Sequence, residues 1–397
     1  MTNKVYFFDS HPVQYKAPVY QELQRILPDS FEIIYASDFS VRGGNVDKEF
    51  GKVIAWDTPL MTGYQFRVLG NERGVPLSSI WSLTGRGIFS LLRRERPKAV
   101  VLTQSRYTFD HVAYLSALVL GIPILIRQET QDEMFSEGRG ALKAWVRSAL
   151  YRLMYAPARH AFSFGELNYE HLVRHGVPPE HISFARFSVP NALAGWSVEQ
   201  KLVARNEMRA KLGIQPEQKV VAFFGKFIPK KNPELLYQAL EHLVAAERRN
   251  IFLLFVGAGE LQQQLENLAA NARRKWGVSS HFAGFVNQSQ LPPYYLATDV
   301  MVLPSRRMGE AWGLVVNEAL QAGCGVVISD AVGCQKEFAD MPRVRVIPVE
   351  GAQPLGNALS ELLSLDRNFE WSREKMQGYS SEAAAAALKA EIARYVN

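Results

Sequence analysis

Short apolar runs alternate along the chain with longer stretches in which apolar residues recur at helical spacing. The runs are almost continuously apolar, which is typical of parallel strands that helices cover on both faces. The stretches between them, for example 233–246 and 260–276, are predicted to form amphipathic helices. The pattern predicts strands at 5–8, 31–35, 99–102, 122–126, 160–164, 181–184, 220–224, 251–256, 281–282, 300–303, 325–328 and 344–347.

The alternation is interrupted near 188–198, where proline, asparagine and glycine fall close together. We therefore predict two doubly wound, Rossmann-like α/β domains, 1–190 and 191–379. Two serines and a glutamate begin a final helix of about residues 380–397, which we expect to pack back on the first domain. Ligands of such domains bind beyond the carboxyl ends of the strands, so a cleft between the domains is the expected site.

Composition narrows the class of protein. The 397 residues are 47% hydrophobic and 21% charged, which is typical of a globular chain. Two cysteines, Cys324 and Cys334, suggest neither a disulfide framework nor a Cys-rich zinc site and suit a reducing cytoplasm. The N-terminus does not resemble a signal peptide, and the longest apolar stretch, 112–126, is interrupted at 121–123, so we expect a soluble or at most peripheral protein. A net charge of +6 favours anionic partners without choosing among nucleotides, lipid surfaces and nucleic acid.

The first candidate motif follows the strand predicted at 220–224. Gly225 permits close approach of the backbone to a ligand, and Lys226 and Lys231 lie in the loop before Pro233, which is expected in the first turn of a helix. Such lysines can pair with phosphates, although a solvated basic loop would show the same pattern.

A second glycine turn, Gly257-Ala258-Gly259, follows the strand predicted at 251–256. It matches part of a dinucleotide-binding fingerprint, but Gln262 stands where the third glycine belongs. A simple tight turn between strand and helix explains it equally well.

The strongest segment follows the strand predicted at 300–303. Gly313 opens a helix whose first residues, Leu314 and Val315, present free N–H groups and a positive dipole end to a pyrophosphate. Glu310 precedes this helix and Glu318 lies about one and a half turns into it, so the two carboxylates can flank a ligand. Taken alone, Glu310 could be an acidic residue at a helix start, and Glu318 could be an ordinary surface residue of the helix.

Two segments of the first domain also follow predicted strands. His11, Gln14 and Tyr15 come after 5–8, and Glu129 comes after 122–126. These four side chains are candidates for the cleft, with Glu129 as an acceptor ligand or base. A lone histidine is more often structural than catalytic, and Glu129 equally suits a helix start.

The stretch 138–160 is basic and amphipathic. A helix of this kind can dock on anionic lipid, although an ordinary packed helix with a solvated face fits as well. Its basic residues are Arg139, Lys143, Arg147, Arg152 and Arg159, and its regularly spaced apolar residues are Leu142, Trp145, Val146, Leu150 and Leu153.

Together these motifs resemble the retaining, GT-B-fold glycosyltransferases of family GT4, and the resemblance covers the whole second half of the chain. Residues 309–318 resemble that family's E-x7-E region, 225–231 its lysine clamp for the diphosphate, and 257–259 its Gly-x-Gly turn. Further matches lie at 281–286 and 319–327.

The resemblance implies roles for these residues. Lys226 and Lys231 would neutralise the donor pyrophosphate, helped by the backbone at 313–315. Glu318 would hold the ribose and Glu310 the transferred sugar. The family more often has arginine at the position of Lys226, and the segment 321–325 lacks its common proline, so diphosphate binding would differ in detail.

The segments His11-Pro12-Val13-Gln14-Tyr15 and 56–64 resemble a bacterial subgroup of GT4 enzymes. This implies a glycan or lipid-linked acceptor in surface polysaccharide or lipopolysaccharide synthesis at the inner face of the cytoplasmic membrane. No Asp-x-Asp pair of a metal-dependent sugar transferase occurs in the sequence, so we expect no metal and no cofactor beyond the nucleotide-sugar substrate.

The expected activity is transfer of a hexose-like sugar from a nucleoside diphosphate to an acceptor hydroxyl. Two alternatives stay open: an epimerase or phosphorylase of the same fold, and a non-catalytic nucleotide-sugar-binding protein. A nucleic-acid partner is not expected, because no recognisable motif supports one.

Overall fold

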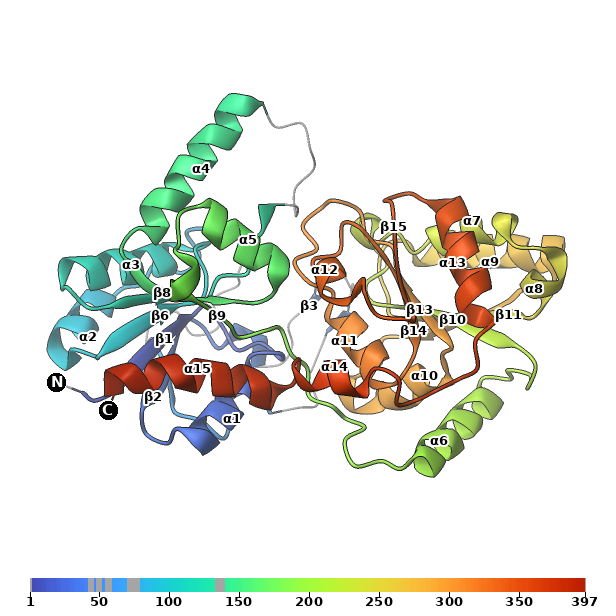
Figure 1. The fold of residues 1–397 in the computed structure, drawn as a ribbon, viewed down its shortest axis with the longest axis horizontal. Helices are drawn as coiled ribbons and strands as arrows, with labels where there is room; N and C mark the ends of the chain where they lie inside the picture. The colour runs from blue at the N-terminus through green and yellow to red at the C-terminus, as the bar shows by residue number, and fades with distance from the viewer. Residues whose placement is uncertain are drawn as a thin grey trace.

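The computed structural model describes residues 2–41, 46–47, 52–53, 59–69, 79–132 and 140–396. Two parallel α/β domains lie side by side, as Figure 1 shows. The first is built on a sheet of order β5-β2-β1-β6-β7-β8-β9. Its strands are β1 (Val5–Asp9), β2 (Phe31–Tyr35), β5 (Phe66–Val68), β6 (Ala99–Leu102), β7 (Ile124–Ile126), β8 (Ala158–Ser163) and β9 (Ile182–Phe184); β3 (Val46–Asp47) and β4 (Lys52–Val53) form a separate antiparallel pair.

The second domain has a parallel sheet of order β12-β11-β10-β13-β14-β15. Its central strands are buried along their whole length, because apolar side chains point to helices on both faces. The strands are β10 (Lys219–Phe224), β11 (Ile251–Val256), β12 (Ser279–Gly284), β13 (Val300–Leu303), β14 (Gly325–Ser329) and β15 (Val344–Ile347).

Helices cover both sheets. In the first domain they are α1 (Ala17–Ile26), α2 (Ile88–Glu95), α3 (Thr108–Val119), α4 (Ala141–Tyr155) and α5 (Glu166–Arg174). After these come α6 (Val198–Lys211), α7 (Leu235–Ala239), α8 (Ala245–Arg249), α9 (Gln262–Trp276), α10 (Pro292–Ala297), α11 (Leu314–Gln321), α12 (Gln335–Phe338), α13 (Ala352–Leu363), α14 (Arg373–Gln377) and α15 (Ser381–Val396).

The final helix, α15, returns to the first domain and packs beside α1 (Figure 1). Ala384, Leu388 and Ile392 on α15 are buried in the same apolar cluster as Val19 and Leu23 on α1. The chain therefore passes between the domains twice, and both passages adjoin the cleft.

Three details differ from the sequence prediction. The stretch 233–246 is divided into α7, a 3-10 turn at Leu240–His242 and α8, and Pro233 precedes α7 instead of lying in its first turn. Among residues 140–160 of the basic stretch 138–160, which are the ones described, the helix covers Ala141–Tyr155, because the chain extends into β8 at Ala158. The edge strand β5 was missed, because three half-buried residues give no clear pattern.

Candidate active site

Two glycine turns meet where β10 and β11 end. The Gly225 N–H donates to the Val256 carbonyl at 2.9 Å, and the Gly257 N–H donates to the Gly284 carbonyl at 2.8 Å. Both backbones are left-handed, with φ of 136° at Gly225 and 147° at Gly257. A Cβ atom at Gly257 would lie 1.9 Å from the Gly225 carbonyl oxygen, so no larger residue fits there.

The N-terminus of α11 faces the same region. Gly313 is its N-cap with φ of 97°, and a Cβ there would lie 2.8 Å from the Leu303 side chain. A helix leaves its first N–H groups without intrahelical partners. Here those first residues are Leu314 and Val315, so the end of α11 can receive an anion.

These elements enclose one cavity of about 210 Å³. It brings together Gly225, Gly257, Leu314, Val315 and Glu318, which the sequence singled out separately. Residues of the first domain and of the passage between the domains complete its wall: Gln14, Tyr15, Val189, Pro190, Phe224, Val256, Phe285, Val286, Gln288, Leu291 and Tyr295.

Glu318 is a half-buried acid in the wall of this cavity. The Tyr295 hydroxyl donates a 2.6 Å hydrogen bond to its Oε2, and the Tyr295 ring stacks on Phe224 with centroids 3.9 Å apart. Burial raises the pKa of Glu318 to about 7, and the hydrogen bond from Tyr295 only partly offsets this. The carboxyl therefore changes charge near neutral pH and has an oxygen available for a ligand hydroxyl.

Lys231 and Glu310 form a direct ion pair. The Lys231 Nζ lies 2.5 Å from the Glu310 Oε2, and the Ser305 hydroxyl approaches the same oxygen at 3.3 Å. Burial raises the pKa of Glu310, but Lys231 and then Lys230 outweigh burial and hold this pKa below its ordinary value. Lys230 also donates to the Gly309 carbonyl at 2.7 Å, which ties the lysine turn to the loop before α11.

Arg306 holds the turn at Pro229–Lys231 in place through its guanidinium group. Its guanidinium donates to the Pro229 carbonyl at 2.5 Å and to the Asn232 side chain at 2.8 Å, and it pairs with Glu234 and Glu350. Asn232 adopts the left-handed conformation, with φ of 53°, which redirects the chain after Lys231. This network presents Lys231 to Glu310.

On the first domain, Tyr15 and Glu129 are joined. The Tyr15 hydroxyl donates to Glu129 Oε1 at 2.8 Å, and the Lys16 Nζ lies 3.8 Å from the same oxygen. Lys16 is itself buried and pairs with Asp9 at 2.6 Å. Burial and the neighbouring Glu129 raise the pKa of Tyr15 well above its ordinary value, so the hydroxyl stays protonated and acts as a donor.

His11 and Gln14 follow β1 in the chain, and Gln14 contacts the second domain. The Ser10 hydroxyl lies 2.8 Å from His11 Nδ1. Burial, with a further contribution from Lys16, lowers the pKa of His11 to about 4, so the imidazole is neutral at pH 7. Gln14 accepts a 3.3 Å hydrogen bond from Gln288 of the other domain.

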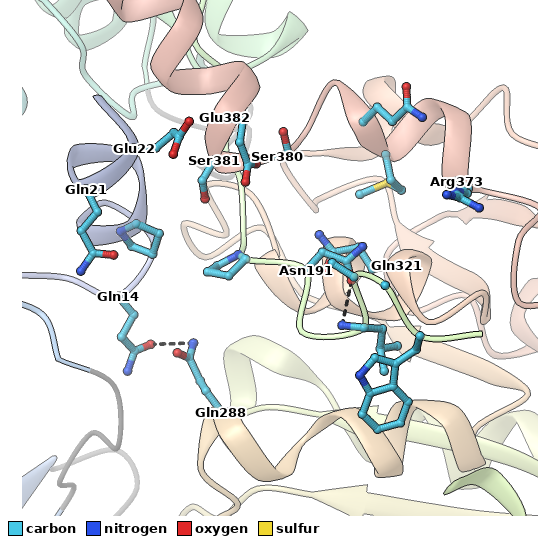
Figure 2. Close-up of a pocket in the computed structure, with 18 of the residues that line it drawn as sticks. Gln14, Gln21, Glu22, Asn191, Gln288, Gln321, Arg373, Ser380, Ser381 and Glu382 are labelled. Atoms are coloured by element: carbon cyan, nitrogen blue, oxygen red, sulfur yellow. Dashed lines mark hydrogen bonds between the residues drawn. The ribbon is translucent and has the colours of Figure 1, made fainter. Parts of the chain in front are cut away.

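Figure 2 shows this glutamine pair at the border of a second, wider cavity of about 1260 Å³. That cavity runs between α1, the start of α15 and the passage from Pro190 to Lys201. Because Gln14, Pro190 and Gln288 line both cavities, the smaller cavity and the wider one adjoin at this pair.

Further hydrogen bonds connect the domains at the loop before α11. The Trp312 indole N–H donates to Asn317 at 2.8 Å, and the Asn317 side chain donates to the Phe187 carbonyl at 3.3 Å. Gln131, two residues after Glu129, donates to the Ala311 carbonyl at 3.3 Å. The Glu129 segment is thus held against the loop that carries Glu310.

The structure brings several of the predicted residues into two groups, and His11, Lys226 and Glu129 belong to neither. One holds the cavity residues around Glu318, with Gln14 and Tyr15, and the other is the Lys231–Glu310 pair. Lys226 lies half-buried directly after Gly225, and Glu129 lies in coil. Of the segment 56–64, residues 56–58 lie outside the described residues, as do 138 and 139 of the basic stretch.

Sequence reasoning assigned no role to Tyr295 or Arg306. Arg306 could have been noticed, because it lies two residues after Pro304, just beyond the end of a buried strand. Nothing in the sequence marked Tyr295, because its partner Glu318 is distant along the chain.

This arrangement, two parallel-sheet α/β domains with a cavity between them, is that of the GT-B class of protein, and solved structures of the class resemble it. The Anabaena protein HepE, solved in complex with UDP, has this arrangement with a TM-score of 0.69 at 14% identity, covering 98% of this chain and 100% of that one. Sucrose-phosphate synthase from Thermosynechococcus elongatus gives 0.68 at 16% identity, covering 98% of each chain. At these identities the likeness shows the fold alone.

Residues 204–382, which make up most of the second domain, match the family described as glycosyl transferases group 1. A D-inositol 3-phosphate glycosyltransferase of Xylanimonas cellulosilytica is 30% identical over 220 residues, 54% of this chain and 49% of that protein. A phosphatidyl-myo-inositol mannosyltransferase of Mycolicibacterium smegmatis is 32% identical over 159 residues, 39% of each chain. The chain spans about half or less of the length of these relatives.

Proposed function

We propose that this protein is a retaining glycosyltransferase that moves a sugar from a nucleoside diphosphate to an acceptor hydroxyl. One observation carries the proposal: a single cavity joins the N-terminus of α11, both glycine turns and the carboxyl of Glu318. The helix end suits a diphosphate, and a carboxylate suits the hydroxyls of a ribose. Both named relatives are glycosyltransferases, which favours transfer over epimerisation.

The leaving diphosphate takes the electron pair of the breaking glycosidic bond, so positive groups near it lower the barrier. Lys231 and Lys226 supply that charge in this proposal, and Glu310 contacts the transferred sugar. Since Lys231 pairs with Glu310, its ammonium group would interact with both the Glu310 carboxylate and the diphosphate when the donor binds. Metal is not needed for this charge balance.

Lys231 gives the sharpest test. Lys231→Ala removes the charge but also leaves Glu310 buried without its cation, which would destabilise the fold by about 3–5 kcal/mol. The double variant Lys231→Met with Glu310→Gln removes both charges and should keep the melting temperature. Its turnover of a nucleotide sugar should fall at least about a hundredfold.

Lys275 provides the matched control, since its side chain is exposed and its ion-pair partner, Glu241, is exposed as well. Lys275→Ala should keep full activity. A folded Lys231→Met/Glu310→Gln protein with wild-type turnover would refute the clamp. Incubation with donor alone separates epimerisation, which needs no acceptor, from transfer, and a pure binding protein would show no turnover in any form.

The acceptor belongs to the first domain in this proposal. Tyr15 and Glu129 form one hydrogen-bonded unit opposite the Glu310 loop, which suits an acceptor hydroxyl. We propose a glycan or lipid-linked acceptor of surface polysaccharide or lipopolysaccharide synthesis. No helix in the described part of the chain is long and apolar enough to cross a membrane.

A lipid-linked acceptor requires contact with a membrane surface, and α4 is the candidate element. It projects from the first domain (Figure 1). Its Leu142, Trp145, Leu150 and Leu153 are 61–74% exposed, and its charged residues are all basic. We propose that this face enters the interface of an anionic bilayer.

The test is co-sedimentation with vesicles. Leu150→Glu with Leu153→Glu should abolish binding to vesicles that contain phosphatidylglycerol, and neutral vesicles should bind wild type weakly. Val203→Glu on α6, which replaces another exposed apolar residue, is the control. Equal binding of the α4 variant and the control would contradict the role of α4.

A further inference from the structure

A compact group of metal-ligating side chains lies between α4 and α5, outside the cavity. Among the described residues, Asp132, His171 and His175 place one ligand atom each within 4.8 Å of one another. The two histidines are four positions apart, at the end of α5, so they lie on the same side of the helix. Asp132 ends the segment that carries Glu129.

The two distances from Asp132 to the histidines match the spacing of ligand atoms in a tetrahedral metal site. Asp132 Oδ1 lies 3.1 Å from His171 Nδ1 and 3.3 Å from His175 Nε2. Ligand atoms of tetrahedral zinc stand about 3.3 Å apart, because each bond to the metal is about 2.0–2.1 Å long. Both distances to Asp132 therefore suit an ion, and the third distance, between the two histidine nitrogens, is at most 4.8 Å.

The outward nitrogens of both histidines are already held. The Tyr155 hydroxyl lies 3.0 Å from His171 Nε2, and the Ser148 hydroxyl lies 3.2 Å from His175 Nδ1. A metal-binding histidine usually donates its second ring N–H to such a partner, which fixes the tautomer and orients the ring. Both side chains come from α4, so the helix supplies the outer shell of the site.

Burial also suits a bound ion. The His171 side chain is fully buried and that of His175 is 5% exposed, whereas Asp132 is 21% exposed and leaves a path from solvent. Arg174 occupies the second oxygen of Asp132, at 2.6 Å from Oδ2. Arg174 is 60% exposed, so its cation can withdraw into water when a metal takes Oδ1.

We propose that Asp132, His171 and His175 bind one divalent cation of the zinc class. Imidazole with a carboxylate suits zinc, cobalt and nickel, and water completes the coordination. The site is structural. It fastens the segment 128–132 to α5, where Asn168 already donates to the Gln128 carbonyl at 3.0 Å and the Thr130 carbonyl at 2.6 Å. It thereby supports Glu129 and the Gln131 contact with the second domain, and it does not depend on the proposed activity.

Cobalt titration of the metal-free full chain tests the site, because bound Co²⁺ absorbs visible light. Wild type should saturate at one equivalent with a band that Zn²⁺ abolishes. His175→Gln should lose the band, and Ser148→Ala should weaken binding about tenfold. Arg174→Gln should tighten binding several-fold, because it removes the competing cation from Asp132. His181→Gln, at an exposed histidine outside the cluster, should bind as wild type does.

Zn²⁺ should also raise the melting temperature of wild type but not of His175→Gln, since a ligand that binds the native state stabilises it. The melting temperature of the metal-free variant shows whether it folds, and Asp132→Asn, which keeps the shape of the side chain, repeats the test if it does not. The proposal would be overturned if wild type and His175→Gln gave equal Co²⁺ spectra, or if Arg174→Gln did not change the affinity for Co²⁺. The three side chains would then form a hydrogen-bonded cluster without a metal.

Discussion

Glu318 gives a prediction about stability that needs no substrate. Burial raises the pKa of its carboxyl from 4.5 to about 7 in the folded chain, whereas the unfolded chain titrates near the ordinary value. Between these values the folded state holds a proton that the unfolded state has released. The corresponding stability is fully present below about pH 4.5 and is lost as the pH rises through 7.

The magnitude follows from the two pKa values. Each unit is worth about 1.4 kcal/mol, so a shift from 4.5 to about 7 costs the native state at most about 3.5 kcal/mol by pH 8. Solvent in the cavity reduces this figure, because Glu318 is only half-buried. Glu318→Gln keeps the shape and can still accept the hydrogen bond from Tyr295, but it cannot ionise.

The assay is denaturant unfolding of wild type and Glu318→Gln from pH 5 to pH 8. Between pH 5 and pH 8 the stability difference should move in favour of the variant by up to about 2.5 kcal/mol, because the unfolded carboxyl already titrates near pH 4.5. The contributions of all other titrating groups to the free energy of unfolding are the same in both proteins, so they cancel when the two are subtracted. A difference that stays constant with pH would refute the buried, protonated carboxyl.

Glu310→Gln is the control with the opposite sign. Lys231 and Lys230 hold the pKa of Glu310 below its ordinary value, so its charged form stabilises the fold above about pH 4.5. This variant should be less stable than wild type at pH 7. The nucleotide should raise the melting temperature of wild type more at pH 8 than at pH 6 if ionised Glu318 binds the ribose, and Glu318→Gln should lose that pH dependence.

Two further predictions concern the glycine turn and the first domain. Gly257→Ala should destabilise the chain by about 3 kcal/mol and abolish nucleotide binding, because the new Cβ would lie 1.9 Å from the Gly225 oxygen. Thermal unfolding measures this effect, with Gly140→Ala as the control because a Cβ there meets nothing within 4 Å. Equal melting temperatures of the two variants would contradict the prediction. His11 has a pKa of about 4 in the folded chain, below its ordinary 6.5, so its contribution is present above pH 6.5 and is lost as the pH falls toward 4. Unfolding of His11→Gln should therefore depend less on pH over that window than unfolding of wild type, and parallel curves would show that His11 is solvated.

The sequence alone determined the parallel α/β class and most of the strands, because a strand buried on both faces must be continuously apolar. It also located Gly225, Gly257 and Gly313, because a glycine between a predicted strand and a predicted helix is a local feature of the sequence. The contacts that exclude a Cβ at Gly257 and Gly313 come from Gly225 and Leu303, so only the fold reveals them. Partly buried elements such as β5 gave no pattern, and the helix predicted over 233–246 was interrupted by a turn that local spacing did not reveal.

Tertiary structure decided every relation between residues distant in the chain. The pairing of Lys231 with Glu310, the Tyr295 hydrogen bond that holds Glu318, and the Tyr15–Glu129 contact each join separate loops. The Asp132, His171 and His175 cluster depends likewise on a loop returning to α5. Periodicity and propensity report the environment of a residue relative to its own helix or strand, whereas a pKa or a ligand set depends on what other segments bring within a few ångströms. The order of elements was therefore readable from the sequence, and the chemistry of the cleft required the fold.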